Sequence, residues 1–184
     1  MELIGLYLIA CALLVGAGVA KAVRPRDTAR ALAGMVPMRF ATTVTVVRVG
    51  AVVEALLGLV AMVLPRPIPS ALVALSYLLF AGFVLYARSK GGALASCGCF
   101  GTTDTPATML HAVINIALAV SALSVALAGT GGTMASVLSR QPWHGLPLIG
   151  ASGLGAWLCV LALSVLAELQ AARRLVGVTF ERTE

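Results

Sequence analysis

Long apolar runs separated by short polar stretches are the dominant pattern along this chain. A helix that crosses a bilayer needs about 20 consecutive, mainly apolar residues. Five runs meet this length, over Leu3–Val23, Thr42–Leu64, Ile68–Ala87, Pro106–Ala128 and Pro147–Glu168. The connections between them leave no room for a soluble domain. The pattern therefore predicts an all-α membrane protein, with four spans in residues 1–128 and an outside loop, a fifth span and a short basic tail in residues 129–184.

Local signals predict where some of these helices begin and end. Thr105 followed by Pro106 is typical of an N-cap and a first helical position, so the fourth span is expected to start there. The proline-rich stretch 65–69 is expected to form a tight turn between the second and third spans. After Gly129, the segment up to Leu146 is predicted to be a longer loop with room for a short helix.

The positive residues are distributed unevenly between the two ends of the predicted bundle. The chain is 60% hydrophobic and 11% charged, with a net charge of +6. The first and third connections and the C-terminal tail are basic, whereas the second and fourth connections hold only Arg66 and Arg140. The positive-inside rule puts the N-terminus outside and the first and third connections in the cytoplasm, in a bacterial inner membrane. The charge therefore indicates topology and contact with membrane lipids, and not binding of nucleic acid.

The third connection holds the most reactive sequence of the chain, CGCFG at residues 97–101. A disulfide between Cys97 and Cys99 would close a very small, strained ring and would be easier to reduce than a structural disulfide. Closing so small a loop gains little stability, which favours thiol–disulfide exchange over a structural role. Metal binding is the alternative. With His111, the two thiols would suit copper(I) better than zinc, but the four ligands of a zinc site are missing and no metal is predicted.

The CGCFG pentapeptide after a third hydrophobic segment resembles the signature of the MauE/DoxX-type redox-associated membrane proteins. Lys21 at the end of the first span, Glu54 and Gly58 in the second span and Asn115 in the fourth span also agree with that family. The resemblance covers roughly Leu3–Ala128 and leaves out the fifth span. It implies a DoxX-like four-helix transmembrane bundle.

The resemblance also implies a function. MauE itself is associated with maturation of the disulfide-rich small subunit of methylamine dehydrogenase, beside a thioredoxin-like partner. By this likeness, Cys97 and Cys99 would be the catalytic pair of a thiol–disulfide oxidoreductase with a thioredoxin-like partner. Assisting an exported subunit would require the motif outside the cytoplasm, whereas the charge pattern puts it inside. The sequence leaves this conflict open.

Polar residues inside the predicted spans are further functional candidates, because such residues are costly in lipid. Arg48 and Glu54 lie in the second span, and Thr108, His111 and Asn115 are spaced to share one face of the fourth. Arg48 and His111 are expected about 9 Å and about 8 Å from the side of the cysteine loop. In the functional interpretation, Arg48 or His111 stabilises a cysteine thiolate, and Glu54 and Asn115 continue a proton path or a pocket for a quinone head. In the structural interpretation, all four tie the bundle together by interhelical hydrogen bonds, and Arg48 reaches back to the interface.

Two classes of function follow from the sequence. The first is a membrane thiol–disulfide oxidoreductase, with a quinone as the candidate electron carrier. The second is a non-catalytic subunit or assembly factor of a larger respiratory or dehydrogenase complex, in which the dithiol is incidental or holds a metal. Cys11 and Cys159 lie mid-span among apolar residues and are interpreted as small buried hydrophobes, and Tyr77 is interpreted as a packing residue.

Overall fold

The computed structural model describes residues 3–32, 39–89, 108–129 and 132–181. The helices are α1 (Ile4–Val23), α2 (Pro25–Leu32), α3 (Phe40–Val63), α4 (Pro67–Ser89), α5 (Met109–Ala128), α6 (Met134–Leu138), the 3-10 helix η1 (Pro142–Gly145) and α7 (Leu146–Glu181). Five segments are long and apolar enough to span a membrane: α1, α3, α4, α5 and the stretch Pro142–Val165 formed by η1 and the first part of α7. Together with the absence of strands among the described residues, this confirms the predicted all-α membrane fold.

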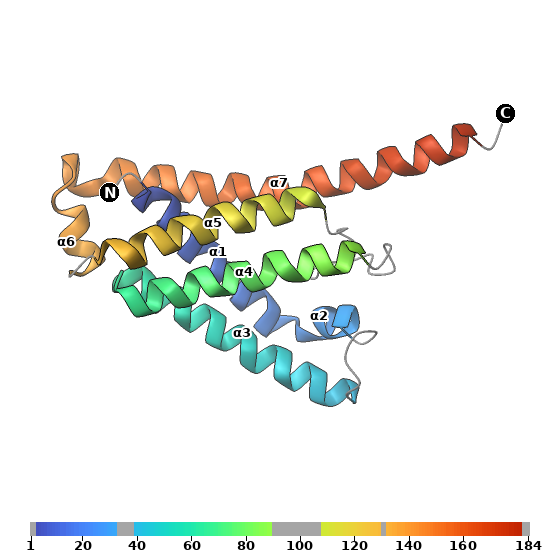
Figure 1. The fold of residues 1–184 in the computed structure, drawn as a ribbon, viewed down its shortest axis with the longest axis horizontal. Helices are drawn as coiled ribbons and strands as arrows, with labels where there is room; N and C mark the ends of the chain where they lie inside the picture. Colours follow the sequence, from blue (N-terminus) through green and yellow to red (C-terminus); the bar gives the residue numbers. More distant parts are fainter. Residues whose placement is uncertain (1–2, 33–38, 90–107, 130–131, 182–184) are drawn as a thin grey trace.

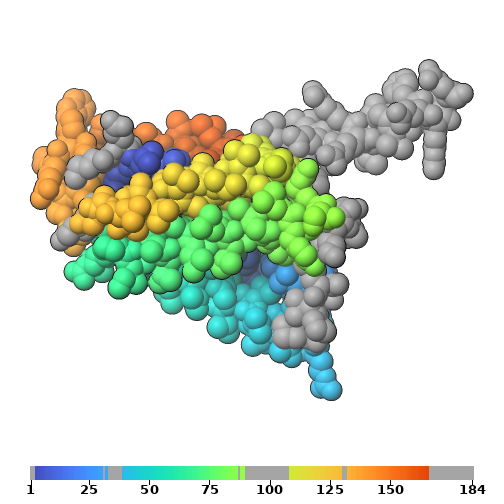
Figure 2. Space-filling model, in the orientation of Figure 1, coloured from blue at the N-terminus to red at the C-terminus, as the bar shows by residue number. Residues whose placement is uncertain are grey.

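The first helix, α1, is the centre of the bundle. It passes behind α4 and α5 in Figure 1 and packs on α3, α5 and α7. Half of its residues are buried, a larger share than in any of the other four spans. α4 and α5 pack side by side and form one continuous surface in Figure 2. α3 rests mainly on α1 and diverges from α4 toward the end of the bundle where α2 lies (Figure 1).

Two tyrosine hydroxyls tie α1 to its neighbours in the apolar interior. Tyr7 of α1 donates to the Ala61 carbonyl at 2.9 Å and lies 2.9 Å from the Ser70 hydroxyl. Tyr77 of α4 donates to the Ala10 carbonyl at 2.6 Å. Since the bilayer core offers no water to such groups, hydroxyls paired within the protein fix the arrangement of the helices. Tyr77 is a packing residue, as predicted.

The crossing of α1 and α3 depends on two glycines. A Cβ atom on Gly18 would lie 2.7 Å from the carbonyl oxygen of Ala51, and one on Gly58 would lie 2.9 Å from Cγ2 of Val15. Real Cβ atoms essentially never come this close to other heavy atoms, so the two helices can approach only because these positions carry hydrogen. The crossing brings the last turns of α1 against the middle of α3.

The helix ends differ from the prediction at several points. α4 already begins at Pro67, so the turn after α3 is limited to residues 64–66. Proline is tolerated in a first helical turn, because the N–H groups there have no partner within the helix. α2 was not expected: the basic stretch after α1 forms two turns that pack on α1 and α3. α6 is the predicted short helix, and α7 continues past the predicted end at Glu168 to Glu181, beyond the rest of the bundle (Figure 1).

Candidate functional site

A charged pair joins α1 and α3 inside the bundle. The Lys21 ammonium donates a hydrogen bond to the Glu54 carboxylate and forms an ion pair with it. Both side chains are mostly buried, with exposed fractions of 10% for Lys21 and 24% for Glu54. An unpaired charge in such surroundings is costly, so each group is accommodated because it neutralises the other.

An aromatic ring of α4 completes the surroundings of the ammonium. Nζ of Lys21 lies 4.7 Å from the centroid of the Phe80 ring, which is within cation–π distance. The Phe80 ring in turn meets Tyr77 edge-to-face, with centroids 6.1 Å apart. Three helices, α1, α3 and α4, therefore converge on one positive charge.

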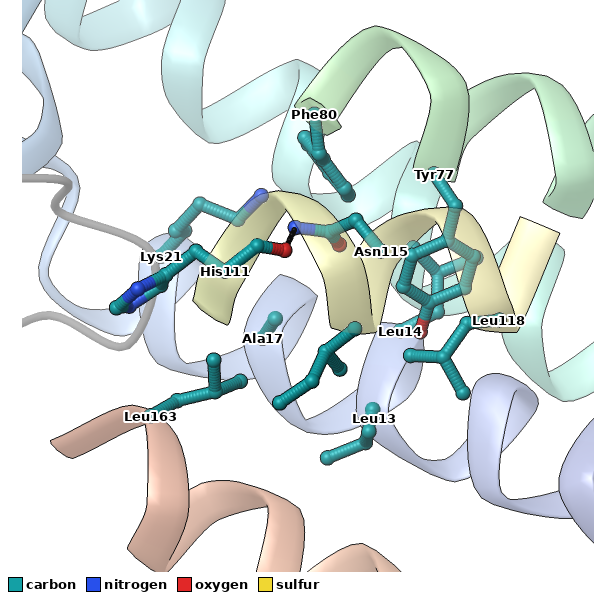
Figure 3. A pocket seen from close by; sticks show the side chains of 11 residues that line it. Leu13, Leu14, Ala17, Lys21, Tyr77, Phe80, His111, Asn115, Leu118 and Leu163 are labelled. Atoms are coloured by element: carbon teal, nitrogen blue, oxygen red, sulfur yellow. Dashed lines mark hydrogen bonds between the residues drawn. The ribbon is translucent and has the colours of Figure 1, made fainter. Parts of the chain in front are cut away.

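A small cavity lies beside this charge, between α1, α4, α5 and α7 (Figure 3). Its volume is about 40 Å³, several times the roughly 10–15 Å³ that one water molecule needs. The lining is mostly aliphatic, and its polar groups come from Lys21, Tyr77, His111 and Asn115. Figure 3 shows Lys21 and Asn115 directed into the same space from α1 and α5. The cavity is an apolar chamber with a few convergent polar groups, which suits water or a small polar group.

The imidazole of His111 caps α5. Nδ1 of His111 lies 2.9 Å from the Thr108 hydroxyl and accepts from the Thr108 backbone N–H at 3.4 Å. Nδ1 is thus an acceptor, so the proton of the neutral ring is on Nε2. The predicted helix start at Pro106 is wrong: α5 begins at Met109, because Thr108 is extended and forms the cap. Thr105 and Pro106 themselves lie outside the described residues.

Asn115 lies one turn deeper on the same face of α5. Its Nδ2 donates to the His111 carbonyl at 2.7 Å, so this bond holds the amide on its own helix. Thr108 contacts the His111 ring, and His111 and Asn115 line the same cavity, so the face predicted from the spacing of these three residues is confirmed. Lys21, which shares the cavity with His111 and Asn115, links that face to Glu54.

The two predicted catalytic residues, Cys97 and Cys99, lie outside the described residues, in the segment that joins α4 to α5. The two ends of this segment, Ser89 and Thr108, are at the same end of the bundle as α2 (Figure 1). The prediction that the first and third connections share one side is therefore confirmed. The dithiol segment starts and finishes at the end of the bundle where the ion pair and His111 lie.

Arg48 is the one supporting candidate that the structure separates from this site. It is exposed on α3 and lines a second pocket against α2, together with Arg24, Arg26 and Arg30. The spacing within one span could not reveal this, because the side of α3 that meets α2 is set by an unexpected helix.

Lys21 and Phe80 are site residues whose roles the sequence did not reveal. From the sequence, Lys21 is one of the basic residues that indicate orientation and one of the residues that agree with the family, but no partner for its charge is predicted. The available signal was that Lys21 and Glu54 are opposite charges in neighbouring spans, each of which requires compensation. Phe80 gave no signal, because an aromatic residue in an apolar span is ordinary.

The described part of this site offers ionisable and hydrogen-bonding groups but no thiol. The Lys21 ammonium, the His111 imidazole and the Asn115 amide line a cavity with room for water. Cys11 is buried in α1, as predicted, beside the Tyr7 hydroxyl, and Cys159 is half-buried in α7; both are free thiols. Among the described residues, no three His, Cys, Asp or Glu side chains lie close enough together to hold a metal ion.

Comparison with known proteins identifies a family. No curated protein and no solved structure matches the chain significantly. The family described as "Methylamine utilisation protein MauE" matches residues 2–129. This range comprises α1 to α5, the CGCFG motif and all the polar residues around the cavity, and it leaves out α6, η1 and α7. The chain is a membrane protein of the MauE family.

Proposed function

We propose that this MauE-family membrane protein exchanges electrons with a thioredoxin-like protein through the Cys97–Cys99 dithiol. One observation carries the proposal: the family match contains both the dithiol and the buried polar site, and the ends of α4 and α5 that flank the dithiol segment lie at the end of the bundle where that site is. Methylamine utilisation, which the family description names, is the process in which this exchange would operate.

The exchange proceeds through a mixed disulfide. When the loop is oxidised, a partner thiolate attacks one loop sulfur, breaks the Cys97–Cys99 bond and releases the other cysteine as a thiolate. The second partner thiol, after losing its proton, attacks the partner sulfur of the mixed disulfide and releases the remaining loop cysteine. Two electrons and two protons have then moved from the partner to the loop, and the partner holds the disulfide. The same steps in reverse oxidise the loop.

The buried polar site supports this chemistry by handling protons at the same end of the bundle. Each thiol that becomes a nucleophile must lose a proton, and each released thiolate takes one up. His111 presents Nε2–H as a hydrogen-bond donor to a released thiolate, because Nδ1 accepts from the cap. The cavity between His111 and Lys21 has room for water, which can relay protons between the two. Turnover also needs a second electron carrier, for which a quinone in the bilayer is the candidate.

The orientation that the charge pattern favours completes the proposal. The dithiol loop would face the cytoplasm of a bacterial inner membrane and would exchange with thiols there.

Trapping of the mixed disulfide tests the function. Removing the cysteine that resolves the intermediate leaves it without an internal route of escape. Either Cys97→Ser or Cys99→Ser should therefore accumulate a covalent adduct with a thioredoxin-like protein, detected on non-reducing gels and released by dithiothreitol. Cys11→Ser is the matched control, because Cys11 is buried in α1 and should trap nothing.

A negative outcome would be equally clear. If neither loop variant traps a partner and the double serine variant complements a deletion strain fully, the dithiol is dispensable. A non-catalytic assembly role in a larger membrane complex would then replace the exchange function.

A further inference from the structure

The second pocket, between α2 and α3, is lined by guanidinium groups. It has a volume of about 330 Å³ and holds Arg24, Arg26, Arg30 and Arg48. One carboxylate, that of Asp27, is also present, and Nη1 of Arg30 donates to it at 2.8 Å. Four positive groups thus face one negative group, and the pocket carries an excess of positive charge.

The remaining arginines have no acid to neutralise them within the described part of the chain. Arg24, Arg26 and Arg48 are exposed and form no ion pair among the described residues. Guanidinium groups bind phosphate oxygens through two parallel N–H donors, which makes an arginine cluster a better phosphate site than a lysine cluster. The pocket is therefore complementary to a phosphate-bearing anion.

The pocket lies at the depth of lipid headgroups. α1 has 20 residues and is about 30 Å long, which matches the hydrocarbon thickness of a bilayer. Arg24 is the first residue after α1, so it enters the headgroup layer. Arg48 lies within α3 but faces α2, and its long side chain can reach the same level.

An exposed apolar stripe continues from the pocket toward the membrane centre. Val52 and Leu56 follow Arg48 at intervals of four residues, so they lie below it on the same face of α3. Their exposed fractions are 44% and 55%. A ligand with a phosphate at one end and hydrocarbon chains at the other can contact both the arginine pocket and the apolar stripe, whereas free phosphate would contact only the arginines.

We propose that the pocket formed by Arg24, Arg26, Arg30 and Arg48 binds the phosphate headgroup of an anionic phospholipid, whose acyl chains lie along Val52 and Leu56 of α3. Binding would fasten α2 to α3, since the lipid phosphate bridges arginines of both helices. The site is separate from the Lys21–Glu54 pair and does not depend on thiol chemistry.

Native mass spectrometry of the full-length protein, released from mixed micelles of phosphatidylglycerol and phosphatidylcholine, tests this site. The wild type should retain phosphatidylglycerol in preference to phosphatidylcholine. Arg24→Gln with Arg48→Gln should lower that retention about fivefold for each arginine removed. Arg66→Gln with Arg140→Gln is the matched control: it removes the same charge from exposed positions outside the pocket and should retain the lipid like the wild type.

Three results would overturn the proposal. One is equal retention of both lipids by the wild type, which needs no variant and is independent of folding. Another is an equal loss in the pocket variant and the control variant, which would indicate non-specific charge attraction. The third is displacement of the lipid by inorganic phosphate at concentrations where dihexanoyl-phosphatidylglycerol does not compete, which would assign the pocket to free phosphate.

Discussion

Among individual side chains, the Lys21–Glu54 pair has the greatest energetic consequence. Its members come from α1 and α3, and the Phe80 ring covers the ammonium. Removing one partner from a buried ion pair costs roughly 3–5 kcal/mol, because the other charge remains uncompensated. The low end of that range applies here, since Glu54 keeps an exposed fraction of 24%.

A double-mutant cycle on this pair should therefore show strong coupling. Glu54→Gln is expected to lower the free energy of unfolding in dodecyl sulfate mixed micelles by roughly 3 kcal/mol. Lys21→Met is expected to cost less, because the Glu54 carboxylate that it leaves alone is the more exposed member of the pair. The double variant should lose less than the sum of the two single variants, by about 1–3 kcal/mol. Additive losses would show that the two groups do not interact in the membrane.

His111 and Arg48 give opposite expectations for the loop cysteines. His111 is at the end of α5 that adjoins the dithiol segment, whereas Arg48 lies in the separate arginine pocket. His111→Ala should shift alkylation of Cys97 and Cys99 by iodoacetamide to higher pH, since an Nε2–H donor that can stabilise a thiolate by hydrogen bonding is lost. Arg48→Ala should leave the pH profile in place. A shift in Arg48→Ala without one in His111→Ala would contradict the assignment of these residues.

Among the helices, the crossing of α1 and α3 decides whether the ion pair can form. Gly18 lies one turn before Lys21, and its backbone meets Ala51 and Ala55, which flank Glu54 in α3. The pair therefore depends on how closely two backbones approach, and not only on the presence of two charges.

Gly18→Ala and Gly16→Ala form a matched test of this crossing. A Cβ at position 18 would lie 2.7 Å from backbone atoms of α3, whereas one at position 16 would meet nothing within 4 Å. We expect Gly18→Ala to destabilise the protein by about 1–3 kcal/mol, as overpacked interiors do, and Gly16→Ala to be neutral or stabilising. The measurement is the same unfolding titration, and equal effects would mean that α1 and α3 are not in close contact.

The spans could be predicted from sequence, whereas the site could be predicted only in part. Span positions need only the bilayer thickness, so α1 and α3 are found to within one or two residues of the expected ends. Periodicity within one helix also placed His111 and Asn115 on a common face. Predicting which residues of different helices pair, such as Lys21 with Glu54, requires the crossing geometry of the helices. A hydropathy pattern does not contain that information. The surroundings of Arg48 depend on α2. This helix has eight residues and is too short and too polar to be recognised from a hydrophobic pattern.

For the protein as a whole, the arrangement of the connections gives a test of orientation. The end of α4 and the start of α5 lie at the end of the bundle where α2 lies, whereas α6 lies at the opposite end (Figure 1). Ser89→Cys and Ser139→Cys, each in a background without the four native cysteines, report on these two ends. An impermeant maleimide applied to intact cells should label position 139 and should reach position 89 only after permeabilisation. The reverse labelling would put the dithiol loop outside the cytoplasm.

If the dithiol of this MauE-family protein cycles between thiol and disulfide, as we propose, a redox titration will show a two-electron transition. The purified full-length protein is equilibrated in glutathione or dithiothreitol buffers of stepped potential, and its free thiols are counted by maleimide mass shift. We expect a reversible loss of two thiols with a slope of about 30 mV per tenfold change, as a two-electron couple requires. The variant with Cys97→Ser and Cys99→Ser should lack this transition, whereas Cys11→Ser should retain it. Two thiols that stay free in every buffer, or a transition that survives the double substitution, would contradict redox cycling of Cys97 and Cys99.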